Sequence, residues 1–216
     1  MYIKPINQNI RIIIKCPVKN KSLKMRKALF WSHYFMLLLL VLMLSNFSAS
    51  AQKTTIWVVN HAESDDNSDK LSQTGEERAI DLEKRLKHEG VEVIYITAKN
   101  VSAATANPLA AKVKILPRVY TDSVQKFATI IKNNFIGKKV LIITNYNTIL
   151  PLLAALGADT PFDSLDKEDY DQLFTVTIKP SGDVDCMVTT YGKKHHTNAI
   201  PQSYILDNYS QGLPGR

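Results

Sequence analysis

The feature that most constrains the fold is an apolar run, Ile56 to Val59, that ends abruptly in the polar segment Asn60-His61-Ala62-Glu63. Such a run, bounded by polar residues, predicts a buried β-strand. In open α/β sheets, ligands bind outside the carboxyl ends of the strands. His61 is therefore a candidate functional residue, although a histidine that begins a loop is otherwise often a plain surface residue.

The rest of the chain alternates between helical and strand-like patterns. Helices are predicted over about 74–89, 123–135 and 147–156, with a loop that runs into a helix over 97–111. Strands are predicted over 91–95, 113–120 (around Pro117), 140–143, 173–178 and 184–191. This alternation predicts a three-layer α/β/α sandwich with a mostly parallel central sheet. We expect the fully apolar strand 140–143 to lie next to the 55–59 strand and parallel to it.

The charge of the chain separates two regions. The net charge is +7, but residues 1–51 hold eight of the 27 Lys and Arg residues and none of the 20 Asp and Glu residues. Residues 52–216 therefore carry 19 basic and 20 acidic residues, a net charge of about −1. This balance, without interleaved aromatic and basic residues, gives no indication of nucleic-acid binding.

The basic region has the pattern of a secretory signal peptide. Lys24, Arg26 and Lys27 precede the ten-residue apolar run Phe35–Leu44, and Ala49-Ser50-Ala51 is a small-residue cleavage signal. Because 25–51 is a complete signal by itself, Met25 is a candidate start. We expect export to the periplasm or the extracellular space. The alternative is an uncleaved leader that anchors the chain, although the run is shorter than a usual membrane span.

Three regions follow from these patterns. Residues 1–51 form the leader, residues 52–192 form the folded domain, and residues 193–216, which have few apolar residues, predict a loose C-terminal tail. The tail contains the adjacent pair His195-His196. Adjacent side chains point apart in an extended chain, so we expect no metal site there, and no motif indicates a cofactor.

Several short motifs, in order, resemble those of the histidine phosphatase superfamily, the phosphoglycerate mutase-like proteins. The segment 60–63 resembles the opening Arg-His-Ala-Glu of that family. Leu71-Ser-Gln-Thr-Gly75 and Thr105-Ala-Asn-Pro-Leu-Ala110 resemble its next two segments, and Tyr191-Gly192 resembles its close. The resemblance covers about residues 54–192. It implies the fold predicted above and a phosphoryl-accepting histidine at His61.

The same resemblance implies a cationic clamp of two arginines and a second histidine around the phosphoryl group. This chain departs from it at each position. The first arginine is replaced by Asn60, the second by Val101, and the second histidine by Asn145, which is followed by Tyr146 and by the matching pair Asn147-Thr148. An asparagine can donate a hydrogen bond, but it lacks the charged two-pronged grip of a guanidinium group.

One carboxylate is a candidate for the acid that protonates the leaving group. Asp122 follows the third predicted strand and is a candidate acid, but an aspartate at that place is also typical of a helix N-cap. Glu63 matches the opening motif and could instead line the pocket.

The sequence therefore predicts a degenerate, exported member of the fold with a binding or interaction role for an unidentified small molecule or protein. Two alternatives stay open. One is an active phosphatase that works through His61, with Lys99, Lys112 or Arg118 moved into the clamp. The other is a protein that binds an uncharged ligand with Asn60, His61, Asn145 and Tyr146 as a polar pocket floor.

Overall fold

The computed structural model describes residues 34–37, 52–65 and 69–208. The chain divides into a unit of residues 1–50 and a unit of residues 51–216. Only residues 34–37 of the predicted leader are described, so its cleavage site and the candidate start at Met25 lie outside the described residues. Within the described ranges, no helix is long and apolar enough to cross a membrane.

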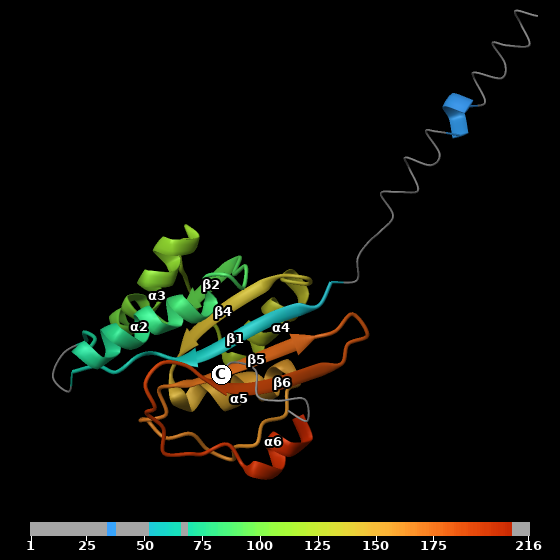
Figure 1. Cartoon of the computed structure of the whole chain (residues 1–216). Coiled ribbons are helices and arrows are strands. Elements are labelled where there is room, and N and C mark those ends of the chain that lie inside the picture. Colours follow the sequence, from blue (N-terminus) through green and yellow to red (C-terminus); the bar gives the residue numbers. More distant parts are fainter. Residues whose placement is uncertain (1–33, 38–51, 66–68, 209–216) are drawn as a thin grey trace, which may run out of the picture. The chain divides into compact units, whose positions relative to one another are not determined.

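The second unit is built on one sheet, which has six strands in the described residues (Figure 1). The elements in chain order are β1 (Thr54–Asn60), α2 (Gln73–Leu86), β2 (Val93–Ile96), α3 (Asn100–Val113), β3 (Arg118–Val119), α4 (Val124–Asn134), β4 (Lys139–Thr144), α5 (Tyr146–Leu156), β5 (Gln172–Ile178), β6 (Val184–Thr190) and α6 (Gln202–Asn208). The strand order is β3-β2-β4-β1-β5-β6. The first four strands in this order are mutually parallel, and β5 and β6 are antiparallel to their neighbours. The predicted sandwich and the predicted pairing of β1 with β4 are therefore confirmed.

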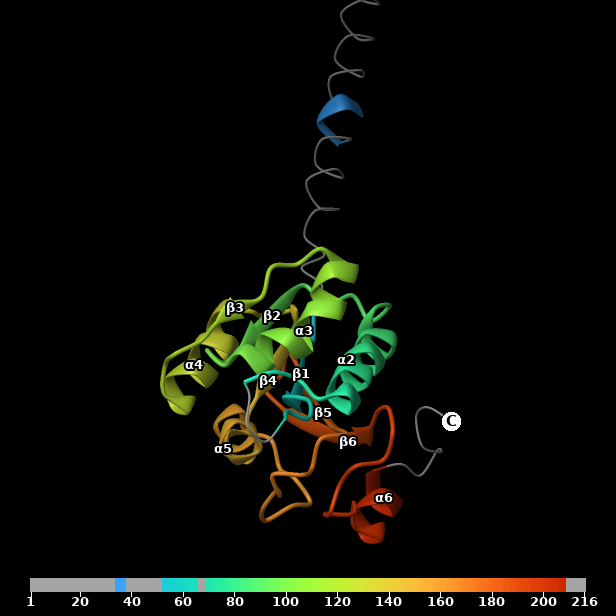
Figure 2. The same ribbon diagram turned by 90° about the vertical axis from the view of Figure 1, so that its left-hand side faces the viewer.

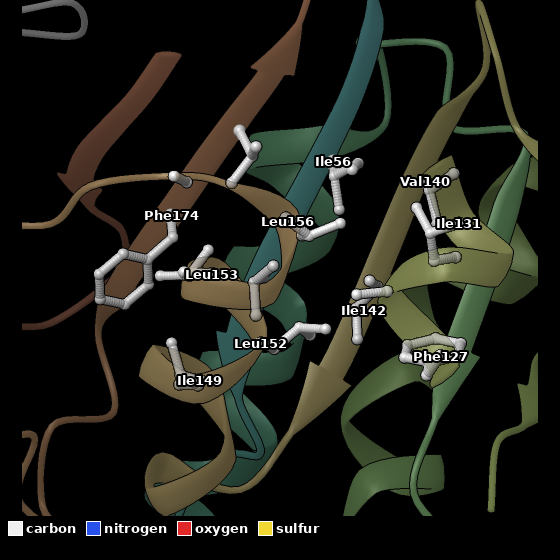
Figure 3. Packing of buried hydrophobic residues seen from close by; sticks show 14 of the residues in the cluster. Ile56, Phe127, Ile131, Val140, Ile142, Ile149, Leu152, Leu153, Leu156 and Phe174 are labelled. Atoms are coloured by element: carbon white, nitrogen blue, oxygen red, sulfur yellow. The ribbon is translucent and has the colours of Figure 1, made fainter. Parts of the chain in front are cut away.

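Helices cover both faces of the sheet, as the turned view shows (Figure 2). One face packs against α4 and α5, and Figure 3 shows Phe127, Ile131 and Leu152 from these helices beside strand residues such as Ile142. The other face carries Trp57 and packs against α2 and α3. Because successive side chains of a strand point to opposite faces, a strand between two helical layers needs apolar residues on both sides. The unbroken apolar runs of β1 and β4 meet this need.

The N-terminus of α2 is fixed against the loop that follows β1. Ser72 is the N-cap, and its hydroxyl accepts a hydrogen bond from the Gly75 N–H at 3.1 Å. A Cβ atom on Gly75 would lie only 2.0 Å from the Glu63 carbonyl oxygen, so this contact requires glycine. The serine and the glycine of the 71–75 motif thus hold the helix to the segment that contains His61.

Two predicted elements differ in their bounds in the structure. The first predicted helix ends at Leu86, with Lys87 as C-cap, rather than running to Gly90. The strand predicted over 113–120 is reduced to Arg118–Val119, because α3 continues to Val113. Both differences lie at element ends, where local patterns are least specific.

The expectation of a loose tail is wrong for residues 193–208. The Tyr204 hydroxyl of α6 donates a hydrogen bond to the Cys186 carbonyl of β6 at 2.6 Å, and Ile200 and Tyr204 pack against the core. The tail has few apolar residues, but polar contacts along residues 193–198 hold it to the domain. A local apolar pattern does not detect such contacts.

Candidate functional site

The candidate site lies at the carboxyl ends of two adjacent parallel strands. The register of β1 and β4 pairs Asn60 with Thr144, and the His61 N–H donates to the Thr144 carbonyl at 2.9 Å. Asn145 is the next residue after β4. The fold therefore places His61 and Asn145 at the same edge of the sheet, as the sequence predicted.

The ring of His61 is held in one tautomer. Its Nδ1 atom lies 3.0 Å from the Ala62 carbonyl oxygen. A carbonyl can only accept, so Nδ1 carries the hydrogen and Nε2 keeps its lone pair. Burial lowers the pKa of His61 below its ordinary value of 6.5, despite the hydrogen bond to Ala62, which raises it. At neutral pH the imidazole is therefore an uncharged base with a free Nε2 lone pair.

The backbone that follows His61 is tied to α3. The Ala62 N–H donates to the Thr105 hydroxyl at 3.0 Å, and that hydroxyl donates to the Val101 carbonyl at 2.7 Å. The threonine of the Thr105-Ala106 motif therefore connects the loop that begins at His61, which we call the histidine loop, to the start of α3. Val101 is itself only 3% exposed, and its side chain has no hydrogen-bonding group to offer a phosphate.

Asn60 is turned toward a loop rather than toward open space. Its side chain is 1% exposed, and its Nδ2 atom donates to the carbonyls of Lys167 and Asp169 at 3.4 and 3.5 Å. These two acceptors fix the orientation of the carboxamide. The position that the family resemblance assigns to an arginine thus serves here to hold the loop of residues 166–171.

The residues after β4 form the first turn of α5. Asn145 is the N-cap by position, but its side chain makes no capping hydrogen bond. Its Oδ1 atom is buried and has no hydrogen-bond partner among the described residues. Tyr146 is half-buried, and Asn147 is exposed, with its carboxamide oxygen accepting from the Thr148 hydroxyl at 3.3 Å.

The carboxylates of Asp122 and Glu63 are both engaged in ion pairs. Asp122 pairs with Lys126 at 2.6 Å. The N-cap of α4 is Ser123, so the prediction that Asp122 caps this helix is wrong; its position is one residue too early to accept from the first-turn N–H groups.

Glu63 is buried and lies against Arg78, whose Nη2 and Nε approach the carboxylate at 2.6 and 2.7 Å. The Nδ1 atom of His195 lies 2.8 Å from the same carboxylate. Burial alone would raise the pKa of Glu63, but the hydrogen bonds from Arg78 and His195 outweigh it and the pKa lies below its ordinary value. Glu63 is therefore an ionised anchor at neutral pH.

Two lysines bring positive charge to His61. The charges of Lys99 and Lys167 both lower the pKa of His61, while Asp69 raises it. Lys99 precedes α3, and Lys167 lies in the 166–171 loop. The other two cations considered from the sequence lie elsewhere. Lys112 is in the last turn of α3, about 20 Å along the helix from its start, and Arg118 is on the edge strand β3.

The sequence reasoning missed Arg78, Lys167 and Tyr170. The ring of Tyr170 is 6.4 Å from that of His61 and 5.2 Å from that of His195, between centroids. One signal was available: Arg78 lies on the same stripe of α2 as Leu82 and Leu86, four and eight residues on, so burial of its guanidinium was predictable. Lys167 and Tyr170 lie in a loop that has no such pattern.

A cavity of about 470 Å³ adjoins the site between the loop after β1, α2 and α3. Its polar wall includes Asp69, which acts on the charge of His61, and Asn100, which follows Lys99. The wall also holds the charged or polar residues Asp65, Lys70, Glu76 and Asn107, and the apolar residues Leu71, Ala79, Ile80, Ala104 and Pro108. This volume is within the range of small-molecule sites.

Comparisons of the sequence with family models and with curated proteins give no match. Comparison of the structure does. The protein histidine phosphatase SixA complexed with tungstate matches 66% of this chain and 96% of its own, at 16% identity and a TM-score of 0.50. A mycobacterial glucosyl-3-phosphoglycerate phosphatase matches 66% of this chain and 100% of its own, at 12% identity and a TM-score of 0.50.

A third structure, mycobacterial hydrolase 2, matches 76% of this chain and 100% of its own, at 12% identity and a TM-score of 0.50. The match in each case spans nearly the whole length of the solved structure. At these identities the likeness concerns the fold alone. The chain has the phosphoglycerate mutase-like α/β fold of these solved structures.

Proposed function

We propose that this chain is an exported protein of histidine phosphatase fold that is impaired in phosphoryl transfer and acts through binding. The observation that carries the proposal is the state of the three clamp positions. Asn60 is buried and holds a loop, Val101 is buried and has no polar side-chain group, and Asn145 is an uncharged residue at the start of α5.

The nucleophile position is intact. Phosphoryl transfer to histidine needs a neutral imidazole with a free nitrogen, and His61 meets this requirement through its Nδ1 bond to Ala62. The scaffold thus keeps the part of the chemistry that depends on the strand and its following loop.

The three clamp positions lack charged donors. A phosphoryl group in transfer carries negative charge on its three equatorial oxygens, which enzymes stabilise with cationic or hydrogen-bond donors held in place. Removal of one such donor typically costs about 10²- to 10³-fold in rate. With two arginines and a histidine absent together, a loss of about 10⁴-fold or more is expected even when the effects are not additive.

The acid is lacking as well. Glu63 has a pKa below its ordinary value and is bonded to Arg78, so it has no proton to give at neutral pH. The Asp122 carboxylate is paired with Lys126 on the opposite side of β4 from β1, in the segment before α4.

A binding role is supported by the room beside the site. The cavity between α2 and α3 combines apolar walls with Asp69 and Asn100, and Asp69 and His61 interact electrostatically.

Export is supported by the apolar run and the cleavage signal in residues 25–51. Mass spectrometry of the exported protein should find Gln52 at its N-terminus, and a membrane-bound product with its leader intact would contradict export in soluble form.

The test of the proposed function is an assay with a generic aryl phosphate. The parent and His61→Ala should give the same background rate, because the parent has no working clamp. A parent that hydrolyses the ester well above His61→Ala would refute the proposal.

A second function, a working phosphatase, is favoured by one observation. Lys99 and Lys167 both act on the charge of His61 and could supply cations to a phosphoryl group. In that case Lys99→Met and Lys167→Met would each lower a His61-dependent rate. Lys112→Met, at the far end of α3, is the matched control and should leave that rate unchanged.

A further inference from the structure

A segment that the sequence indicated to be loose is bound to the domain next to His61. We name residues 193–198 the strap. Its contacts include three carboxylates, Glu63, Asp169 and Asp171, each of which is almost fully buried. Two of these carboxylates flank Tyr170 in the 166–171 loop, and the third is two residues from His61.

Asp169 is the principal anchor of the strap. Its Oδ1 accepts from the N–H and hydroxyl of Thr197 at 2.7 and 3.1 Å, and its Oδ2 accepts from Asn198 Nδ2 at 2.8 Å. The same carboxylate accepts from the Asp166 N–H at 2.7 Å, inside the loop. Burial alone would raise the pKa of Asp169, but these hydrogen bonds outweigh it and the pKa lies below its ordinary value. One carboxylate thus ties the loop to itself and to the strap.

Asp171 and Glu63 hold the two histidines of the strap. Nδ1 of His196 lies 2.8 Å from both oxygens of Asp171, and the His195 N–H donates to Asp171 at 3.1 Å. Nδ1 of His195 lies 2.8 Å from Glu63, while the His195 carbonyl accepts from the Tyr170 N–H at 3.0 Å. The strap is therefore bonded both to the histidine loop and to the 166–171 loop.

The 166–171 loop in turn forms part of the surroundings of His61. Its Lys167 lowers the pKa of His61, and its Tyr170 ring lies 6.4 Å from the imidazole. Its carbonyls at Lys167 and Asp169 hold the carboxamide of Asn60. Contacts of the strap to this loop therefore fix what His61 faces.

We propose that the strap positions the candidate site: by holding Asp169 and Asp171, it keeps Lys167 and Tyr170 against His61. His195 and His196 are positioning residues in this arrangement. The proposal rests on the proposed function only in taking His61 as the centre of the site. It predicts that loss of strap contacts changes the titration of His61, although the hydrogen bond and the ring contact described for the imidazole are to Ala62 and Tyr170 rather than to the strap.

The test is an NMR titration of His61 in the double variant His195→Ala/His196→Ala. Release of the strap should let water reach the imidazole and let Lys167 move away. Both burial and the charge of Lys167 lower the pKa of His61 in the parent, so its pKa should rise toward the ordinary value. Amide exchange at Asp169, whose N–H bonds within the loop to Asp166, should become at least about tenfold faster.

The matched control is His88→Ala, which removes an exposed histidine after α2 and should change neither measurement. If the double variant does not fold, the milder Thr197→Val/Asn198→Ala variant removes side-chain donors to Asp169 and should shift the His61 pKa in the same direction. The proposal is overturned if amide exchange shows residues 193–198 released while the His61 titration and Asp169 exchange stay as in the parent.

These measurements need no substrate, so their outcome is separate from that of the phosphatase assay. A parent that proves to be an active phosphatase would overturn the proposed function and leave the role of the strap standing. An unchanged His61 titration after strap release would overturn the role of the strap and leave the proposed function standing.

Discussion

Two polar regions lie two residues apart on the loop after β1, and they differ in how fully they are bonded. At His61 the only hydrogen bond of the ring among the described residues is to the Ala62 carbonyl, and nearby Asn60 Oδ1 accepts none. At Glu63 the carboxylate is bonded to both Arg78 and His195. Charged groups with several hydrogen bonds thus gather at Glu63, which holds the strap, rather than at His61.

The difference shows that Arg78 serves the structure of the domain rather than the surroundings of His61. Phosphoryl transfer needs guanidinium groups that face a pocket, whereas Arg78 faces a carboxylate and two backbone carbonyls, those of Tyr191 and Lys193. Its Nη1 and Nη2 groups donate to these two carbonyls of the C-terminal segment, while Nε and Nη2 also donate to Glu63. A buried pair of this kind constrains the fold strongly and leaves no charge for an anionic ligand.

The largest effect should come from breaking the buried ion pair between Glu63 and Arg78. Glu63→Gln removes the charge that neutralises Arg78, whose side chain is 1% exposed, and should destabilise the fold by about 3–5 kcal/mol. Urea denaturation of the parent and the variant measures this change.

The control for that variant is Glu92→Gln, which breaks the exposed pair with Lys138 and should cost at most about 1 kcal/mol. Equal losses for the two variants would mean that the buried pair is no more important than a surface one, and the contrast between the regions would fail.

The next effect concerns the site. Asn60→Arg with Asn145→His returns two clamp groups to adjacent strand ends, and the double variant should hydrolyse an aryl phosphate on the order of 10²-fold above the parent. Adding His61→Ala should abolish the gain. A folded double variant that binds no phosphate or vanadate would mean that these positions no longer share one pocket.

The two regions should also lose stability in different ranges of pH. The pKa of His61 lies below its ordinary 6.5 in the folded state, so the unfolded chain takes up that proton first and stability declines as pH falls below about 6.5. The pKa values of Glu63 and Asp169 lie below their ordinary 4.5 and 3.8, so their contribution is complete above about 4.5 and is lost only below it.

Denaturation midpoints from pH 8 to pH 3 test these two ranges. His61→Gln should remove the decline near pH 6 and keep the one below 4.5, whereas Glu63→Gln should weaken only the lower one. A single decline that neither substitution alters would contradict the assignment.

The smallest effect is on the titration of His61. Lys99→Met and Lys167→Met should each raise its pKa, and Asp69→Asn should lower it, because these are the signs of the charges they remove. An NMR titration of His61 in each variant tests these predictions through the direction in which its pKa moves. A pKa that fails to respond to either lysine would remove the support for the second candidate function.

Much of the fold was predictable because it follows from local patterns. The apolar runs of β1 and β4 require burial on both faces, which places these strands in the middle of a sheet. Gly157, which directly follows the predicted helix over 147–156, is the C-cap of α5 with a positive φ of 90°. Element ends, such as that of α2 at Leu86, were less well predicted because no single residue there dictates the boundary.

By itself the sequence determined the sandwich, the place of His61 at the end of β1 and the uncharged side chains of Asn60, Val101 and Asn145, because each depends on residue type and near-neighbour spacing. Only the tertiary structure decided the partners of those residues. Glu63 bonds to His195 across 132 positions, and Asn60 bonds to the Asp169 carbonyl across 109. Such contacts arise when loops from distant segments meet at one sheet edge, and no spacing along the chain encodes which donor finds which carboxylate.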